Sequence, residues 1–169
     1  MRISLNQNVP IGVHVPYQSE LVLSEQTFAR PNITELTPVS FVGSLLRSEG
    51  GVMVEGEISY TLSTLCDCCL TPVTRQAKFS FSEFFGAEGT DEQEFDYALD
   101  GQVLDLTSAV TDAVLYELPG RIVCKEDCKG LCPVCGCNRN ISSCECESLP
   151  DESNPFYALL LAQQDSEKK

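Results

Sequence analysis

Residues 52–72 read VMVEGEISYTLSTLCDCCLTP, and this stretch decides the fold. From Val52 to Leu62 apolar and polar side chains alternate, and a period of two predicts a half-buried β-strand. The predicted apolar face consists of Val52, Val54, Ile58, Tyr60 and Leu62. CDCCLTP then predicts a turn, and the alternation resumes at Val73, Ala77, Phe79 and Phe81. The sequence therefore predicts an antiparallel hairpin with Cys66 and Cys69 at its tip.

The residues before this hairpin predict one more strand of the same sheet. Val39–Arg47 is rich in apolar and β-branched residues, as strands are. Glu49-Gly50-Gly51 predicts the tight turn that connects it to the hairpin. Met1–Leu5 is a candidate for a short strand, whereas prolines and glycines interrupt much of residues 1–38.

After the hairpin the pattern changes from strand to helix. Residues 86–94 predict a surface loop, and Phe95–Leu99 and Gln102–Leu104 are candidates for short strands. Apolar residues then recur at helical spacing, which predicts an amphipathic helix with Asp105 as its N-cap and Pro119-Gly120 as its end. The expected stripe, which should cover one face of the sheet, is Leu106, Ala109, Val110, Ala113, Val114 and Leu118.

Eight of the ten cysteines form four close pairs. The pairs are Cys66 and Cys69, Cys124 and Cys128, Cys132 and Cys135, and Cys144 and Cys146. One tight turn can point two sulfur atoms at one metal ion, and two such turns complete a tetrahedral thiolate site. In the CPVCG segment we expect Pro133 to shape the turn and Gly136 to leave space for backbone amides near the thiolates. Four pairs therefore predict two structural zinc ions.

The spacing also predicts how the pairs combine, with exchange of ligands between the two sites left open. One compact site is expected from the last two pairs, Cys132, Cys135, Cys144 and Cys146. The other would join the hairpin tip to the end of the helix through Cys66, Cys69, Cys124 and Cys128. Cys68 and Cys137 break the pair spacing and are expected to be bystander thiols.

These elements predict an α+β fold, an antiparallel β-sheet with one amphipathic helix packed on it and a C-terminal cysteine-rich zinc-knuckle segment. The length of 169 residues predicts a single domain over residues 1–169. We expect the sheet and helix in residues 39–120, the zinc-knuckle segment in residues 121–147 and a tail helix in residues 154–164. Pro155 suits the first turn of that tail helix.

Disulfides are the alternative to metal ligation, and they require an oxidising compartment. The N-terminal MRISLNQNVPIG lacks the apolar run of a signal peptide, and the sequence has no apolar span long enough to cross a membrane. We therefore expect a cytoplasmic protein with no membrane contact, and cytoplasmic cysteines at these spacings are more often metal ligands.

The sequence also argues against an enzyme. His14 is the single histidine, in a Pro-flanked stretch, and we expect it to be an incidental surface residue. No phosphate-binding loop, dinucleotide fingerprint or H-E-x-x-H motif is present. Sites made of four cysteines are closed, whereas catalytic zinc keeps an open position. We therefore expect no catalytic residues and no enzymatic activity.

The charge is strongly acidic and unevenly distributed, with 25 acidic and 11 basic residues and a formal net charge of −14. Residues 91–120 hold eight acids and no base, namely Asp91, Glu92, Glu94, Asp96, Asp100, Asp105, Asp112 and Glu117. Residues 121–146 hold more bases than acids, the bases being Arg121, Lys125, Lys129 and Arg139. An acidic surface attracts basic partners and repels phosphate backbones.

Several segments, taken in order, resemble those of a known family. They are VEGEISYTL at 54–62, C-x-x-C-L at 66–70, LDLTSAVTDAVLYELP at 104–119, CKEDCKGLCPVCGCNRN at 124–140, C-x-C at 144–146 and NPFYALL at 154–160. From Val39 to Leu161 the chain resembles the YceD family, named as large ribosomal RNA subunit accumulation proteins. It departs from that pattern at Cys68, where a basic residue is common, and at Cys137, which follows the C-x-x-C-G.

The resemblance implies a non-enzymatic role in the synthesis, processing or accumulation of large-subunit (23S) ribosomal RNA. The acidic charge adds a mechanism, in which Asp91, Glu92, Glu94 and Asp96 contact a basic ribosomal protein or a large-subunit assembly intermediate. The alternative is direct contact with ribosomal RNA through the zinc knuckles, using Lys125, Lys129 and Arg139. A stand-alone redox or metal-buffering protein is a third class.

Overall fold

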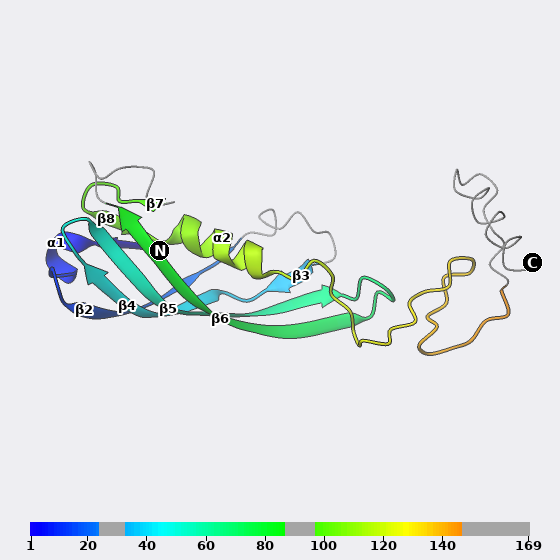
Figure 1. Ribbon diagram of the computed structural model, residues 1–169. Coiled ribbons are helices and arrows are strands. Elements are labelled where there is room, and N and C mark those ends of the chain that lie inside the picture. The colour runs from blue at the N-terminus through cyan, green and yellow to red at the C-terminus, as the bar shows by residue number, and fades with distance from the viewer. Residues whose placement is uncertain (24–32, 87–96, 147–169) are drawn as a thin grey trace, which may run out of the picture.

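The computed structural model describes residues 1–23, 33–86 and 97–146 (Figure 1). Most of the regular secondary structure in this part of the chain is β-sheet, and α2 is its one helix longer than a single turn. The elements in chain order are β1 (Arg2–Ser4), α1 (Leu5–Asn8), β2 (His14–Leu21), β3 (Ile33–Leu36), β4 (Val39–Arg47), β5 (Gly51–Leu65), β6 (Pro72–Gly86), β7 (Tyr97–Ala98), β8 (Val103–Asp105) and α2 (Thr107–Glu117).

The main sheet has the strand order β2-β4-β5-β6-β7, with β3 also paired to β5. Every pairing in it is antiparallel except that of β6 with β7, where Phe85 and Gly86 pair in parallel with Tyr97 and Ala98. The expectation of a purely antiparallel sheet is therefore wrong at this edge. A parallel pair needs a longer crossover than a hairpin does, and residues 87–96, which separate β6 from β7 in the sequence, lie outside the described part.

The hairpin of β5 and β6 is the longest element of the sheet. Its strands of 15 residues each pair along their whole length, from Gly51 opposite Gly86 to Leu65 opposite Pro72. The predicted apolar face of β5 is buried, as are Phe81 and Phe85 of β6. Because each strand buries alternate residues in one core, the register is fixed by the hydrophobic pattern.

Strands β4 and β5 approach unusually closely where Gly43 pairs with Gly56. A Cβ added at Gly43 would collide with the backbone oxygen of Glu55, and one added at Gly56 would lie 2.5 Å from that of Val42. The ring of Phe41 lies over both glycines, 2.8 and 2.9 Å from where these two Cβ atoms would be. The pair of glycines thus makes room for a fully buried phenylalanine.

Helix α2 covers the apolar face of the sheet and buries Ala109, Val110 and Val114 (Figure 1). The predicted stripe lies in the core, because Leu106, Ala109, Val110 and Val114 are buried and Ala113 and Leu118 pack against them. The helix is nevertheless not clearly amphipathic, since Leu115 and Tyr116 place apolar side chains on the exposed side, where Tyr116 is 88% exposed.

The start of α2 differs from the expectation as well. Leu106, not Asp105, holds the N-cap position. Asp105 ends β8, because its pairing with Arg2 of β1 keeps it extended. Its carboxylate still accepts hydrogen bonds from the Thr107 amide at 2.9 Å and the Thr107 hydroxyl at 2.5 Å. Asp105, the residue before the N-cap, therefore accepts the hydrogen bond of an amide that has no partner within the helix.

The N-terminal part contains more structure than its sequence indicates. The expected strand at Met1–Leu5 is β1, which pairs with β8, but α1, β2 and β3 were not predicted. Among the described residues, strand β2 pairs with β4 alone and so lies at the sheet edge, a position at which a proline such as Pro16 is tolerated. His14 begins this strand and is exposed.

The predicted strands at Phe95–Leu99 and Gln102–Leu104 correspond to the shorter β7 and the shifted β8. Gly86 ends β6 rather than beginning a loop, and the rest of the predicted loop lies outside the described residues. The predicted tail helix at 154–164 also lies outside them. Residues 121–146 contain no helix or strand, and Leu131 and Asn138 form an isolated bridge within them. In space, this segment lies at the tip of the β5–β6 hairpin and beyond it, at the end of the sheet opposite α1 (Figure 1).

Candidate metal centre

Within the described residues, eight cysteines gather into two groups of four. We call Cys66, Cys69, Cys124 and Cys128 the hairpin site, and Cys132, Cys135, Cys144 and Cys146 the C-terminal site. In each group the four Sγ atoms lie within 4.8 Å of one another. These are the two groups that the cysteine spacing predicts, without exchange of ligands between them.

The sulfur separations in the hairpin site suit a tetrahedral metal. The Sγ atoms of Cys66 and Cys128 are 3.8 Å apart, and those of Cys69 and Cys124 are 3.6 Å apart. A tetrahedron with metal–sulfur bonds of about 2.3 Å has sulfur–sulfur edges of about 3.8 Å. A disulfide requires a separation of about 2.05 Å, and all ten cysteines are free thiols. The donor set therefore fits Zn²⁺, which prefers four thiolates in this geometry.

The first cysteine pairs of the two sites lie in turns of the same shape. The amide of Leu70 donates to the carbonyl of Cys66 at 2.9 Å, and the amide of Gly136 donates to that of Cys132 at 2.9 Å. Leu70 and Gly136 both have left-handed backbones, with φ of 58° and 72°. A Cβ at Gly136 would meet nothing within 4 Å, so the expectation that this glycine provides space is wrong. Glycine is instead suited to this position because it adopts the left-handed backbone of the turn without steric cost.

This turn stabilises a thiolate at its first cysteine. Burial acts to raise the pKa of the Cys66 thiol, but the amides of Cys68, Cys69 and Cys124 outweigh it and lower the pKa to about 6. The Cys68 and Cys124 amides lie 3.4 and 3.3 Å from the Cys66 Sγ. In the C-terminal site, the amides of the equivalent turn lower the pKa of Cys132 to about 6.

The pKa values of two further cysteines, Cys124 and Cys146, shift in the opposite direction. Burial and the neighbouring thiols of Cys69, Cys128 and Cys66 raise the pKa of Cys124 to about 12. Contact with Cys135, together with burial, raises the pKa of Cys146 to about 12. Four negative sulfurs this close therefore need a compensating cation, and a divalent metal ion would supply that charge when bound.

A reciprocal pair of hydrogen bonds brings Cys124 to the hairpin tip. The amide of Asp67 donates to the carbonyl of Ile122 at 2.8 Å, and the amide of Ile122 donates to the Asp67 carboxylate at 2.5 Å. Arg75 of β6 donates to the carbonyl of Val123 at 2.9 Å. Ile122 is 1% exposed and belongs to the hydrophobic core. The chain after α2 is therefore anchored at the hairpin before it reaches Cys124.

The C-terminal site lies against the hairpin site through contacts of its own. The amide of Leu131 donates to the carbonyl of Cys68 at 3.0 Å, and the side-chain amide of Asn138 donates to Thr71 Oγ1 at 3.3 Å. The Asn140 side chain donates to the Cys128 Sγ at 3.4 Å. Such contacts orient ligands and their thiolates from outside the metal. Asn140, outside the predicted ligands, thus connects the two sites.

The two extra cysteines lie beside the sites but in neither group. Arg121 donates to the Cys68 Sγ at 2.7 Å. The neighbouring thiols of Cys144 and Cys135 raise the pKa of Cys137 to about 12, which places Cys137 against the C-terminal site.

The predicted partner-binding residues are only partly placed. Asp91, Glu92, Glu94 and Asp96 lie outside the described residues. Arg139 donates to the Cys132 Sγ at 3.7 Å. Lys125 forms an ion pair with Asp127 at 3.6 Å, and the backbone amide of Lys129 donates to Asn140. All three basic residues are exposed, and contact with a partner through them stays a prediction.

Sequence reasoning missed three residues that contact the cysteines or their turns, namely Asp67, Arg121 and Asn140. Asp67 carried a local signal, since a short acid inside a C-x-x-C turn is placed to accept backbone amides. Arg121 and Asn140 carried no such signal, because the residues that they contact, Cys68 and Cys128, are distant from them in the sequence.

No helix in the described part of the chain is long and apolar enough to cross a membrane. Uncharacterized proteins of Mycobacterium tuberculosis and Mycobacterium bovis are 37% identical to the chain over 92 residues, which are 51% of this chain and 44% of theirs. One from Mycobacterium leprae is 32% identical over 91 residues, 50% of this chain and 42% of its own. The chain thus spans less than half the length of these relatives. No solved structure matches it.

The YceD family, described as "Large ribosomal RNA subunit accumulation protein YceD", matches residues 54–161. This range holds most of the β5–β6 hairpin, α2 and both cysteine groups. The chain therefore belongs to the YceD family of large ribosomal RNA subunit accumulation proteins.

Proposed function

We propose that this chain is a non-enzymatic ribosome biogenesis factor that supports the synthesis, processing or accumulation of large-subunit (23S) ribosomal RNA. The observation that carries the proposal is the family match, which spans residues 54–161. Family membership connects the chain with the ribosome, and the proposed step is the supply of the large subunit.

We further propose that each cysteine group holds one structural Zn²⁺. Four sulfurs complete the coordination of the ion, so no position stays open for a substrate or an activated water. The ion would neutralise the close thiolates and tie the chain after α2 to the hairpin tip. This arrangement supports a binding protein rather than a metalloenzyme.

The partner that fits the charge is a basic ribosomal protein, alone or within an assembly intermediate. Two zinc ions bound by eight thiolates would leave the cysteine-rich segment with about four additional negative charges. The chain as a whole carries a formal net charge of −14. This negative charge favours a basic protein over naked ribosomal RNA as the partner.

The experiment that tests the proposal is a pull-down of the tagged chain from its own cells, with and without nuclease. A basic large-subunit protein retained after nuclease treatment is the expected result. Loss of all partners after nuclease would instead favour RNA contact through Lys125, Lys129 and Arg139. Deletion of the gene should lower large-subunit RNA relative to small-subunit RNA, and an unchanged ratio would contradict the biogenesis role.

A further inference from the structure

One edge of the main sheet lacks a full partner strand within the described residues. Strand β6 pairs with β5 along all its residues, but on its other side only Phe85 and Gly86 pair, with the two-residue β7. A strand edge presents backbone amides and carbonyls to which another strand can add. In the described part of the chain, no strand pairs with the edge of β6 before Glu83, whereas β7 already pairs with the end of the same edge.

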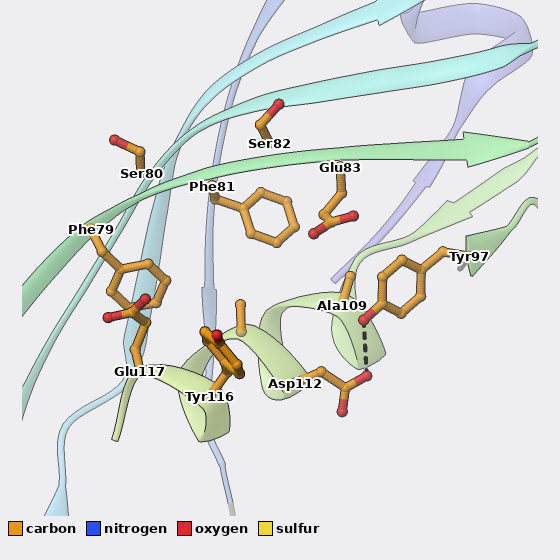
Figure 2. A pocket seen from close by; sticks show the side chains of 11 residues that line it. Phe79, Ser80, Phe81, Ser82, Glu83, Tyr97, Ala109, Asp112, Tyr116 and Glu117 are labelled. Carbon is orange, nitrogen blue, oxygen red and sulfur yellow. Dashed lines mark hydrogen bonds between the residues drawn. The ribbon is translucent and has the colours of Figure 1, made fainter. Parts of the chain in front are cut away.

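A groove of about 500 Å³ runs between this edge and α2 (Figure 2). Its inner wall is apolar. Phe79 and Phe81 point from β6 toward the helix, and Ala109 and Ala113 line the groove from α2. Tyr116 lies on the helix side and is 88% exposed. Aromatic rings beside an open strand edge suit the apolar side chains of an extended peptide.

The charged side chains that line this groove are all acidic. They are Glu83 from β6 and Asp112 and Glu117 from α2. Among the described residues, no lysine, arginine or histidine lines it. The Asp112 carboxylate accepts a hydrogen bond from the Tyr97 hydroxyl at 3.0 Å, which holds it at the groove (Figure 2). Lys78, the nearest basic residue along β6, is paired with Glu57 at 2.7 Å.

We propose that the β6 edge and α2 bind an extended segment of a partner protein that carries apolar residues and lysine or arginine at every second position, so that both kinds of side chain point to the face on which Phe79, Phe81 and Glu83 lie. The segment adds to the sheet as one more strand, so backbone hydrogen bonds to β6 supply sequence-independent affinity. Its apolar side chains pack on Phe79 and Phe81, and its cations meet Glu83, Asp112 and Glu117. The inference rests on the proposed function, because it places the basic ribosomal partner in this groove.

The test uses full-length, zinc-loaded protein and a labelled ten-residue peptide that carries valine and lysine in turn at every second position, with threonine at the positions between them, so that valines and lysines share one face of the strand. Fluorescence anisotropy measures its dissociation constant. Combining Glu83→Gln, Asp112→Asn and Glu117→Gln should weaken binding on the order of tenfold, since each exposed charge contributes modestly. The matched control combines Glu20→Gln, Glu35→Gln and Glu55→Gln, which remove the same charge at exposed positions outside the groove. Equal weakening by both sets would overturn the proposal.

A second peptide separates strand addition from simple charge attraction. Replacing its valines by proline keeps the charge but removes backbone donors and the strand conformation. This peptide should bind at least tenfold more weakly, and the first peptide should protect amides of residues 76–82 from hydrogen exchange. Equal affinity of the two peptides, or no protection of residues 76–82, would contradict the addition of a strand at the β6 edge. A normal ratio of ribosomal RNAs after gene deletion would contradict the proposed function instead, so the two failures are distinguishable.

Discussion

Leu70 and Gly136 follow the second cysteine of the two metal-binding turns with the same left-handed backbone, at φ of 58° and 72°. The left-handed region costs a residue with a Cβ about 1–2 kcal/mol, and glycine avoids that cost. Leu70 is 55% exposed, so its side chain recovers little by burial. Both turns require a left-handed backbone at this position, and only the turn of the C-terminal site has a glycine there.

We therefore expect Leu70→Gly to stabilise the fold slightly, by at most about 1 kcal/mol once the greater freedom of glycine in the unfolded chain is subtracted. Gly136→Ala should destabilise it by about 1–2 kcal/mol. Urea unfolding of the zinc-loaded proteins measures both changes. A loss of stability in Leu70→Gly as large as that in Gly136→Ala would show that Leu70 makes contacts that outweigh its backbone strain.

Gly56 allows the next prediction at this scale, because a Cβ there would lie 2.5 Å from the Val42 oxygen and 2.7 Å from the Gly43 Cα. Backbone atoms cannot rotate away, so Gly56→Ala should cost on the order of 2 kcal/mol in unfolding free energy. Gly120→Ala is the control, since a Cβ at that glycine meets nothing within 4 Å. Equal melting temperatures for the two variants would contradict the close approach of β4 and β5.

Asp105 makes a pH-dependent contribution. Burial acts to raise its pKa, but hydrogen bonds from Thr107 and Arg2 and the Met1 ammonium outweigh it and lower the pKa from 3.8 to about 2. A carboxyl with a depressed pKa stabilises the folded state fully above the unfolded value and loses that effect as pH falls through the folded value. Wild type should therefore exceed Asp105→Asn in stability at pH 5, with the difference shrinking between pH 4 and 2.

Urea unfolding of chelator-treated wild type and Asp105→Asn measures this difference without the added effect of metal release in acid. A difference in stability that stays constant from pH 5 to pH 2.5 would show that the charge of the Asp105 carboxylate does not contribute to stability.

At the scale of the elements, β5 could be predicted because its apolar and polar residues alternate, and β4 because it is rich in apolar and β-branched residues. Strand β2 could not, since Pro10, Gly12 and Pro16 read as breakers, and only its edge position makes Pro16 tolerable. The grouping of cysteines followed from their spacing, since a turn brings neighbouring sulfurs together. The groove between β6 and α2 could not be foreseen, because it depends on how the helix lies across the strand.

The hairpin site connects elements that are far apart in sequence, and the C-terminal site does not. Fixing Cys69 near Cys124 closes a long loop that contains β6 and α2, which costs more chain entropy than a local turn. When a site is absent from the unfolded chain, its binding free energy adds to folding free energy. Cys66→Ser should therefore lower the melting temperature more than Cys144→Ser does, and each variant should retain one zinc ion.

Thermal melts and metal analysis of the two serine variants check this prediction. The reverse order of melting temperatures would contradict the stabilising role assigned to the hairpin site. Loss of both ions from either variant would show that the two sites fill together, through contacts such as that of Asn140 with Cys128.

At the scale of the whole molecule, the fold consists of a sheet with its helix and a cysteine-rich segment with little regular structure. The hydrophobic core is built from strands, α1 and α2, and of residues 121–146 it includes only Ile122. The sheet therefore has its own source of stability, while the segment depends on hydrogen bonds and on the proposed metal ions.

Removal of the metal should reveal this division. Protein purified under reducing conditions should contain two zinc ions per chain, because each cysteine group offers four sulfur ligands. A strong chelator should then abolish hydrogen-exchange protection in residues 124–146, while β4, β5 and α2 keep theirs, because their core contains no cysteine ligand. Re-addition of Zn²⁺ should restore protection. Absence of bound zinc, or protection of residues 124–146 that persists after chelation, would contradict a structural role for the metal, whereas collapse of the whole sheet would show that the metal ions support the core as well.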